Sequence, residues 1–282
     1  MSRVSRLLLG VVGLVMAVFG AMQFWHGYRD LTGSPPSVVT DDRLARIKQA
    51  ADDFVGLAKG YETTGEAPRA SDPKAKPLID AVFDTSALNT PQPLPHADQQ
   101  NIAEWLSQVL KVGSVYIFAG TGYTDYSKIA GADAAAQQKL QRQFEKNTVA
   151  FAPEIGRYLD AQLNVVGALI WSVAGDIAAD PERAKADRTQ KGLDQMRNGT
   201  VTTLNGAVAM FATDGLSDDW RRARLAPLTA VAPKAAAFLL PDQRKTVHDA
   251  ALQIAARMTD PSVKSGLAAF AEAVAGQNPA KM

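Results

Sequence analysis

The stretch "VVGALIWSVAG", residues 165–175, is apolar or small on nearly every side when it is drawn as a helix. It lies inside a longer series of apolar residues at three- and four-residue steps, from Ile155 to Ile177, which predicts one long helix. Eleven such residues are too few to cross the roughly 30 Å hydrocarbon core of a bilayer. A helix that is apolar all round suits the centre of a protein. The sequence therefore predicts a central core helix with the other elements packed around it.

The rest of the chain shows helical rather than strand periodicity. The segment "VYIF", residues 115–118, is β-branched and aromatic, but it continues the apolar stripe of the helix expected over residues 98–119. No alternating runs and no fixed repeat occur. We therefore expect an all-α fold, an irregular multi-helix bundle of roughly seven to nine helices. The expected helices cover or begin at about residues 41–60, 98–119, 134, 153, 180, 241 and 260.

Two regions leave the helix boundaries open or interrupted. Asn198 and Gly199 interrupt the pattern between residues 183 and 213, so one kinked helix and two separate helices both fit. Ser217 is a suitable helix cap, but Pro227 and Pro233 follow it closely. We expect the prolines to limit this region to short helical pieces.

The N-terminus, "RVSRLLLGVVGLVMAVFGAMQFWHGYRD" at residues 3–30, predicts a transmembrane helix. Its apolar run of about nineteen residues gives a helix of roughly 28 Å, close to the thickness of the hydrocarbon core. Trp25 and Tyr28 follow the run and suit the level of the lipid head groups. Arg3 and Arg6 precede it and should stay in the cytoplasm. The alternative is a cleaved signal peptide, although small residues at a cleavage site are poorly represented here.

This reading divides the chain into three parts. Residues 1–30 form the membrane anchor, residues 31–76 a linker with one amphipathic helix at about 41–60, and residues 77–282 an all-helical extracytoplasmic domain. Residues 62–76 are polar and rich in proline, alanine and charge, which is typical of a loop or a partly disordered connector. In a Gram-negative bacterium the chain would span the inner membrane once and place its domain in the periplasm. After signal cleavage it would instead be a soluble periplasmic or secreted protein.

Composition disfavours several classes of function. The chain has no cysteine, which excludes disulfides, thiolate nucleophiles and cysteine-ligated metals. Its 30 basic and 29 acidic residues give a formal net charge of +1, so the total shows no basic excess for nucleic acid as a partner. The three histidines are not spaced as metal ligands, and no motif indicates a cofactor. We expect neither a metal site nor a cofactor.

Two acidic arrangements have a structural and a functional interpretation. Asp80 and Asp84 would share a helix face and could bind a cation, but an exposed pair near a helix end is the simpler reading. Glu104 beside Trp105 suggests a general acid with a raised pKa. Adjacent helix residues point about 100° apart, however, which places Trp105 in the core and Glu104 at the rim.

Two polar loops hold the candidate ligand-binding residues. The segment "GTGYTD", residues 120–125, has the glycine spacing of a phosphate-binding turn but lacks the preceding strand and the lysine, so a helix-ending loop is the better account. In "SDDWRRAR", residues 217–224, the arginines could grip an anion, although Asp218 is placed to pair with them along a capped surface helix. The candidate ligand-binding residues from the two loops are Tyr123, Asp125, Tyr126 and Arg221.

Two functions follow from these observations. The first is a membrane-anchored, periplasm-facing helical domain without catalytic activity, which binds an envelope protein or itself. It rests on the anchor, on the linker and on the lack of a catalytic motif. The alternative is a helical domain that binds a small molecule or glycan, or hydrolyses one, in a pocket between the 120–126 and 214–222 loops.

Overall fold

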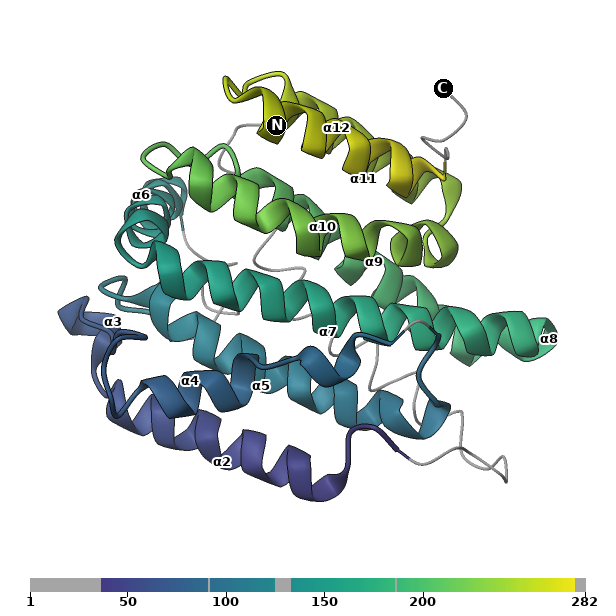
Figure 1. Ribbon diagram of the computed structural model, residues 1–282, viewed down its shortest axis with the longest axis horizontal. Helices are drawn as coiled ribbons and strands as arrows, with labels where there is room; N and C mark the ends of the chain where they lie inside the picture. Colours follow the sequence, from purple (N-terminus) through teal and green to yellow (C-terminus); the bar gives the residue numbers. More distant parts are fainter. Residues whose placement is uncertain (1–36, 91, 125–132, 186, 277–282) are drawn as a thin grey trace.

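The structure is a computed structural model that describes residues 37–276 apart from residues 91, 125–132 and 186. Within this part every regular element is helical, which confirms the all-α class (Figure 1). Nine of the described helices have eight residues or more, in agreement with the expected seven to nine. They are α2 (Asp41–Leu57), α4 (Lys76–Phe83), α5 (Gln99–Phe118), α6 (Ala134–Ala150), α7 (Ala152–Ala179), α9 (Asp187–Met210), α10 (Asp218–Phe238), α11 (Pro241–Ala255) and α12 (Pro261–Ala275). The short elements are α3 (Tyr61–Thr64), α8 (Pro181–Ala184) and the 3-10 turns η1 (Ser86–Leu88) and η2 (His96–Asp98).

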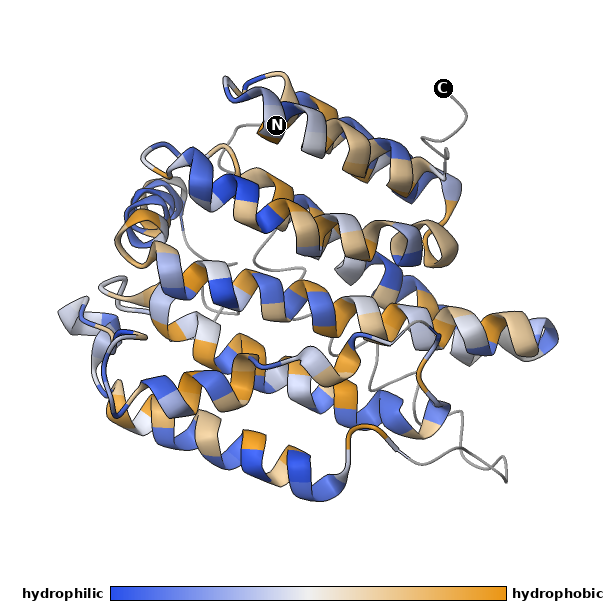
Figure 2. Ribbon diagram, viewed as in Figure 1, coloured by the Kyte–Doolittle hydropathy of each residue, from blue (hydrophilic) through white to orange (hydrophobic). Residues whose placement is uncertain are grey.

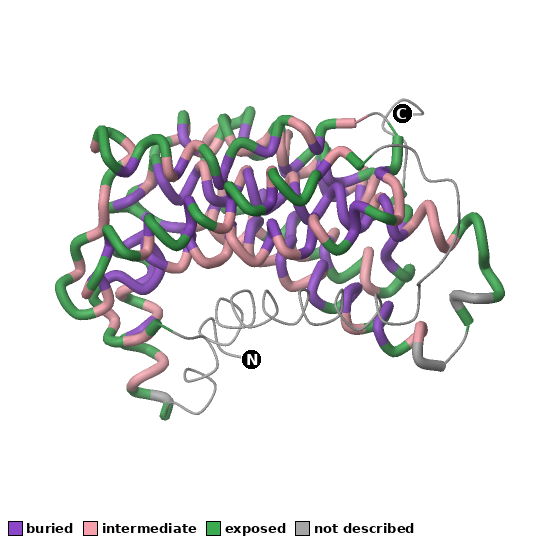
Figure 3. The backbone as a smooth tube through the Cα atoms, turned by 90° about the horizontal axis from the view of Figure 1, so that it is seen from below, coloured by how far each residue is buried: buried purple, intermediate pink, exposed green. Residues whose placement is uncertain are grey.

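The long helices are stacked in one series. In Figure 1 the order from bottom to top is α2, α5, α7, α10 and α12, and each packs on the next. Helix α4 packs on α2 and α5, while α11 joins α12 to α9. Helix α6 is seen nearly end-on in the same view, so it crosses the end of the series rather than joining it. Figures 2 and 3 show the apolar and buried residues along the inward faces of these helices.

Helix α7 is the core helix that the opening stretch predicts. Its residues from Val165 to Ile170 are all buried, with exposed fractions of 3% or less for their apolar side chains. By length and composition it is the one described helix that could cross a membrane. Since 61% of its most apolar window is buried inside the protein, its apolarity is accounted for by α5 and α10 on either side.

Small residues bring the central helices close together. At Gly113 of α5, a Cβ atom would lie 2.2 Å from the ring of Tyr158 of α7. At Gly156 of α7, it would lie 2.1 Å from the guanidinium of Arg224 of α10. A larger residue at either position would displace a packed side chain.

Helix α2 packs into the same core as the rest of the bundle. Its side chains Leu44, Ile47 and Phe54 are buried against α4 and α5, and Phe54 lies 5.8 Å from the ring of Tyr116. This is the amphipathic helix that was expected at about residues 41–60 of the linker, and its buried side chains pack against α4 and α5.

The segment from residue 62 to 76 is also held in place. The Tyr116 hydroxyl donates a hydrogen bond to the carbonyl of Pro68, and the Ala70 N–H donates to Glu154 at 2.9 Å. Glu154 is 3% exposed, so this bond is made inside the protein. Most of the segment is a loop, which agrees with one of the two expected readings, and its contacts with α5 and α7 hold it in one conformation.

Helix α10 runs without a break through Pro227 and Pro233, so the expectation of short helical pieces is also wrong. A proline leaves the carbonyl four residues earlier without a donor. Here those carbonyls belong to Ala223 and Thr229, both exposed, so water can supply the missing donors. Buried side chains on both sides of each proline hold the helix against α7 and α12.

Helix α9 is a single helix from Asp187 to Met210 and includes Asn198 and Gly199. This decides between the two alternatives that the sequence left open. The expected N-terminal transmembrane helix, with Arg3, Arg6, Trp25 and Tyr28, lies outside the described residues. It stays a prediction from the sequence.

Candidate functional site

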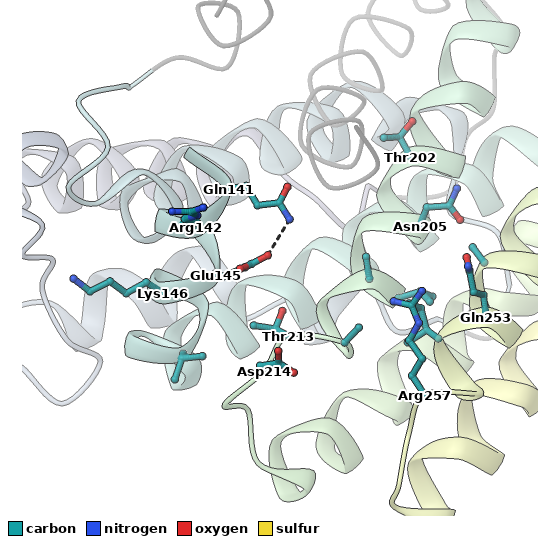
Figure 4. Close-up of a pocket in the computed structure, with 16 residues that line it drawn as sticks. Gln141, Arg142, Glu145, Lys146, Thr202, Asn205, Thr213, Asp214, Gln253 and Arg257 are labelled. Atoms are coloured by element: carbon teal, nitrogen blue, oxygen red, sulfur yellow. Dashed lines mark hydrogen bonds between the residues drawn. The ribbon is translucent and has the colours of Figure 1, made fainter. Parts of the chain in front are cut away.

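A groove of about 670 Å³ lies between α6, α9 and α11, and the turn after α9 forms part of its wall. Figure 4 shows the α6 side chains along one wall and the side chains of α9 and α11 along the other, with Thr213 and Asp214 between them. The volume is within the roughly 300–1,000 Å³ typical of small-molecule sites. The polar lining residues are Gln141, Arg142, Glu145, Lys146, Thr202, Asn205, Thr213, Asp214, Gln253 and Arg257, and the apolar ones are Val149, Val208, Ala209, Ala212, Ala250 and Ile254.

Helix α6 is fixed by its contacts with the end of α5. Asp133 caps its first turn by accepting the Ala136 N–H at 2.8 Å. The Asn147 amide donates to the carbonyls of Ile117 and Ala119, at 3.0 and 2.8 Å, where α5 ends and its own donors run out. The ring of Phe144 packs edge-on against Phe118. These contacts use one narrow side of α6 and leave its polar side facing the groove.

The turn after α9 is held by Arg221. Its guanidinium donates to the carbonyls of Phe211 at 2.8 Å and Thr213 at 3.0 Å and also pairs with Asp218. Gly215 in this turn has a φ of 89°, in the left-handed region that favours glycine. A Cβ atom there would lie 3.2 Å from Val149 of α6, so the turn closes tightly against the α6 wall.

The opposite wall is fixed by bonds from α9 to its neighbours. Arg197 is 9% exposed, donates to the carbonyl of Phe238 and lies over the ring of that residue. The Gln243 amide of α11 donates to Asn198 of α9 at 3.0 Å. Contacts within the protein therefore fix this wall of the groove.

The lining of the groove contains two carboxylates and three cationic side chains. Glu145 accepts a hydrogen bond from Gln141 at 2.9 Å, and Asp214 at the turn is exposed. The three cations of the lining, Arg142, Lys146 and Arg257, form no ion pair with the described residues. Figure 4 shows Arg257 pointing into the groove, whereas Lys146 extends away from it.

Of the four candidate ligand-binding residues proposed from the sequence, the structure describes Tyr123 and Arg221, and neither lines the groove. Tyr123 is half-buried and packs against the core, while Asp125 and Tyr126 lie outside the described residues. Arg221 is 15% exposed and its guanidinium is used by the turn, as described above. Thr213 and Asp214, next to and within the second expected loop, line the groove, but none of the described residues of the first loop does.

The glycine loop after α5 serves to end that helix. Gly120 and Gly122 both have positive φ values, and their N–H groups donate to the carbonyls of Tyr61 and Glu62 at 3.0 and 2.8 Å. These N–H groups would have to be free to bind a phosphate. The loop therefore ties α3 to α5, as the reading of a helix-ending loop predicts.

The acidic pairs also follow the structural interpretation. Asp80 pairs with Lys76 and with Arg157 of α7, and these contacts, the hydrogen bond from Lys76 first, lower its pKa. Trp105 is fully buried and donates to the carbonyl of Val82, while Glu104 is 25% exposed and pairs with Lys48. The placement of Trp105 in the core and Glu104 at the rim is confirmed.

One further polar cluster joins the loop before α5 to the end of α7. Asp176 accepts a hydrogen bond from the Gln99 amide and lies 2.7 Å from the Nδ1 atom of His96. Gln99 also donates to Ser172, whose hydroxyl donates to the carbonyl of Leu94. The serine hydroxyl thus faces a carbonyl, not the histidine, and the cluster fastens the loop. Within the described ranges, no group of three or more histidines and carboxylates is placed to hold a metal.

Comparison with known proteins assigns the chain to no family. No family model matches the chain, and neither the curated proteins nor the solved structures include a match. The groove is therefore interpreted from its own residues. The sequence reasoning missed it because its lining comes from three separate helices. The one available signal was the narrow apolar stripe of α6, which leaves most of that helix polar.

Proposed function

We propose that the protein is a membrane-tethered binding domain, not an enzyme, and that the groove between α6, α9 and α11 holds a small amphipathic molecule. The observation that supports the proposal is the groove itself, with its volume of about 670 Å³ and its mixed lining of apolar and polar side chains. Pockets of this size and mixed lining are the usual form of small-molecule sites.

The distribution of exposed apolar side chains favours a small molecule over a protein partner. The large apolar side chains that are more than a third exposed in the described part are Leu57, Val149, Leu240 and Leu252. Leu57 lies on α2 and Leu240 and Leu252 lie at the start of and within α11, at opposite ends of the series in Figure 1, whereas Val149 lines the groove itself, so the four do not form one patch. Protein-binding surfaces usually present a contiguous apolar patch. An envelope protein partner or self-association is the second candidate, which rests on the tether.

The tether is proposed from the sequence of residues 1–30. Their apolar run is long enough to cross a bilayer, and Arg3 and Arg6 precede it. We therefore propose that the chain lies in a bacterial inner membrane with the helical domain in the periplasm. The site would then sample molecules at the membrane surface or in the periplasm.

A direct test is to purify the full chain from membranes and to identify co-purifying small molecules by solvent extraction and mass spectrometry. Ala209 lies on the α9 wall, so Ala209→Phe should fill the groove. The matched control is Ala237→Phe, at an exposed position of α10 outside the groove. We expect one class of molecule in the wild type and the control, depleted in Ala209→Phe. Equal amounts in all three chains, or a stoichiometric protein in place of a small molecule, would contradict the proposal.

A further inference from the structure

We infer that the ligand of the groove is an anionic amphiphile with an aliphatic chain and a carboxylate head group, and that Arg257 binds the head group. This inference rests on the proposed function and adds the chemical class of the ligand. It rests on the charges and on the composition of the residues that line the groove.

The charge of the lining favours an anion. Arg257 points into the groove and has no carboxylate partner among the described residues, and Arg142 on the facing wall is likewise unpaired. Glu145 is already engaged by Gln141. Asp214 is the one other carboxylate in the lining and is exposed at the turn. Lys146 extends away from the groove, so the argument rests on Arg257, the unpaired cation that points into it. A guanidinium is the group best suited to bind a carboxylate through two parallel hydrogen bonds.

The composition of the lining favours an aliphatic chain over a ring. None of the sixteen residues that line the groove is aromatic. Ligands with bases are commonly held by stacking on aromatic side chains, at about 1–3 kcal/mol per base. The apolar part here consists of valine, alanine and isoleucine side chains from α6, α9 and α11. Such a surface recognises methylene groups through burial, at about 0.8 kcal/mol each.

The inference is tested with the full chain reconstituted in phosphatidylcholine vesicles. The probe is a palmitic acid analogue with a photoreactive diazirine on its chain, and mass spectrometry identifies the labelled peptides. Palmitate and its methyl ester serve as competitors, because they differ in head-group charge and share the chain. Peptides from residues 1–30 report labelling from the bilayer and serve as an internal standard.

Two variants separate the head group from the cavity. Arg257→Gln removes the cation and keeps a polar side chain, and its control is Arg46→Gln, an exposed arginine of α2 at the opposite end of the stack. Ala209→Phe fills the groove, with Ala237→Phe as control. Arg257 is exposed, so its replacement tests the proposal even where the Ala209 variant fails to fold.

We expect labelling of peptides that contain residues 202–214 or 250–257, competition by palmitate, and weak competition by the methyl ester. Arg257→Gln should weaken palmitate binding about ten-fold, which corresponds to about 1.4 kcal/mol, because it removes a charge-assisted hydrogen bond. Arg46→Gln should change nothing. If the methyl ester competes as well as palmitate, or Arg257→Gln binds normally while Ala209→Phe does not, the charge assignment is overturned and the groove stays a binding site. If the groove peptides are not labelled, the inference falls. The proposed function falls as well only if no small molecule co-purifies with the wild-type chain.

Discussion

Arg224 of α10 approaches Asp160 of α7 to 2.7 Å at the interface of the two most extensively packed helices. The two side chains form a partly buried ion pair, with exposed fractions of 16% for Arg224 and 28% for Asp160. Gly156, one turn before Asp160, leaves the space that the guanidinium occupies. Burial raises the pKa of Asp160 to about 6, although Arg224 acts in the opposite direction.

The pair predicts an unusual pH dependence of stability. The pKa of Asp160 is higher in the folded chain than its ordinary value of 3.8, so the folded state binds the proton more tightly. Its contribution to the free energy of unfolding is therefore full below about pH 4 and is lost as the pH rises through about 6. Since one unit of pKa corresponds to about 1.4 kcal/mol, the loss is at most roughly 3 kcal/mol. Urea unfolding from pH 4 to 7 should show this slope in the wild type but not in Asp160→Asn.

The pKa of Asp80 is shifted in the opposite direction to that of Asp160, so Asp80 provides a control. The hydrogen bond from Lys76, followed by the contact with Arg157, lowers its pKa below the ordinary value. Its contribution is present at neutral pH and is lost as the pH falls through that lowered pKa. The wild type should therefore lose stability as the pH falls into the acid range, and the Asp80→Asn variant should lack this part of the loss. A wild-type curve that matches Asp160→Asn at every pH would refute the assignment to Asp160.

The contact between Gly113 and Tyr158 predicts a destabilising substitution. An alanine Cβ at residue 113 would lie 2.2 Å from the Tyr158 ring, which is 2% exposed and packed 6.3 Å from the ring of Phe83. The ring has no free space to move into, so Gly113→Ala should lower the free energy of unfolding by about 1–3 kcal/mol. Chemical denaturation measures this directly.

Gly56 gives the matched control for that substitution. It is exposed within α2, and no atom lies within 4 Å of the position of its Cβ. Gly56→Ala should raise the free energy of unfolding by about 0.5–1 kcal/mol, because glycine inside a helix costs that much relative to alanine. Effects of the same sign at both positions would show that packing against Tyr158 is not the cause.

Much of the fold could be predicted because apolar periodicity records which side of a helix is buried. The central helix at residues 152–179 and the stripe that includes Trp105 were both identified in this way. Local signals failed where tertiary packing overrides them. Pro227 and Pro233 do not break α10, because exposed carbonyls and buried neighbours offset the lost hydrogen bonds.

The groove could not be predicted for a different reason. Gln141, Asn205 and Arg257 are each ordinary polar residues on helices far apart in the sequence, and only the packing of α9 with α11 and of α6 with α5 places them around one space. Arg221 shows the reverse situation. A prominent arginine in a polar loop suggested a ligand contact, but neighbouring carbonyls of the turn engage it.

The absence of cysteine allows a clean test of the membrane topology. Single cysteines can be introduced by Ser2→Cys, before the apolar run, and by Ala237→Cys, at an exposed position of α10. With the N-terminus in the cytoplasm, a membrane-impermeant maleimide should label Ala237→Cys in intact spheroplasts and Ser2→Cys only after lysis. Loss of the Ser2→Cys label from the mature chain would indicate a cleaved signal peptide. The reversed pattern would contradict the proposed orientation.

The amide of Asn147 fixes α6 against the end of α5, and α6 forms one wall of the groove. Its amide is 3% exposed and donates to two carbonyls at the end of α5, where no helical donors are left. Asn147→Ala should lower the free energy of unfolding by about 2 kcal/mol, because it leaves a buried acceptor without a partner. Asn147→Asp keeps the shape but turns the donor into an acceptor, so it should cost at least as much at neutral pH. Gln49→Ala, which removes an exposed amide bond to Asp53, should stay within about 0.5 kcal/mol of the wild type. Should Asn147→Asp be as stable as the wild type, donation to the α5 carbonyls would not be what fixes α6.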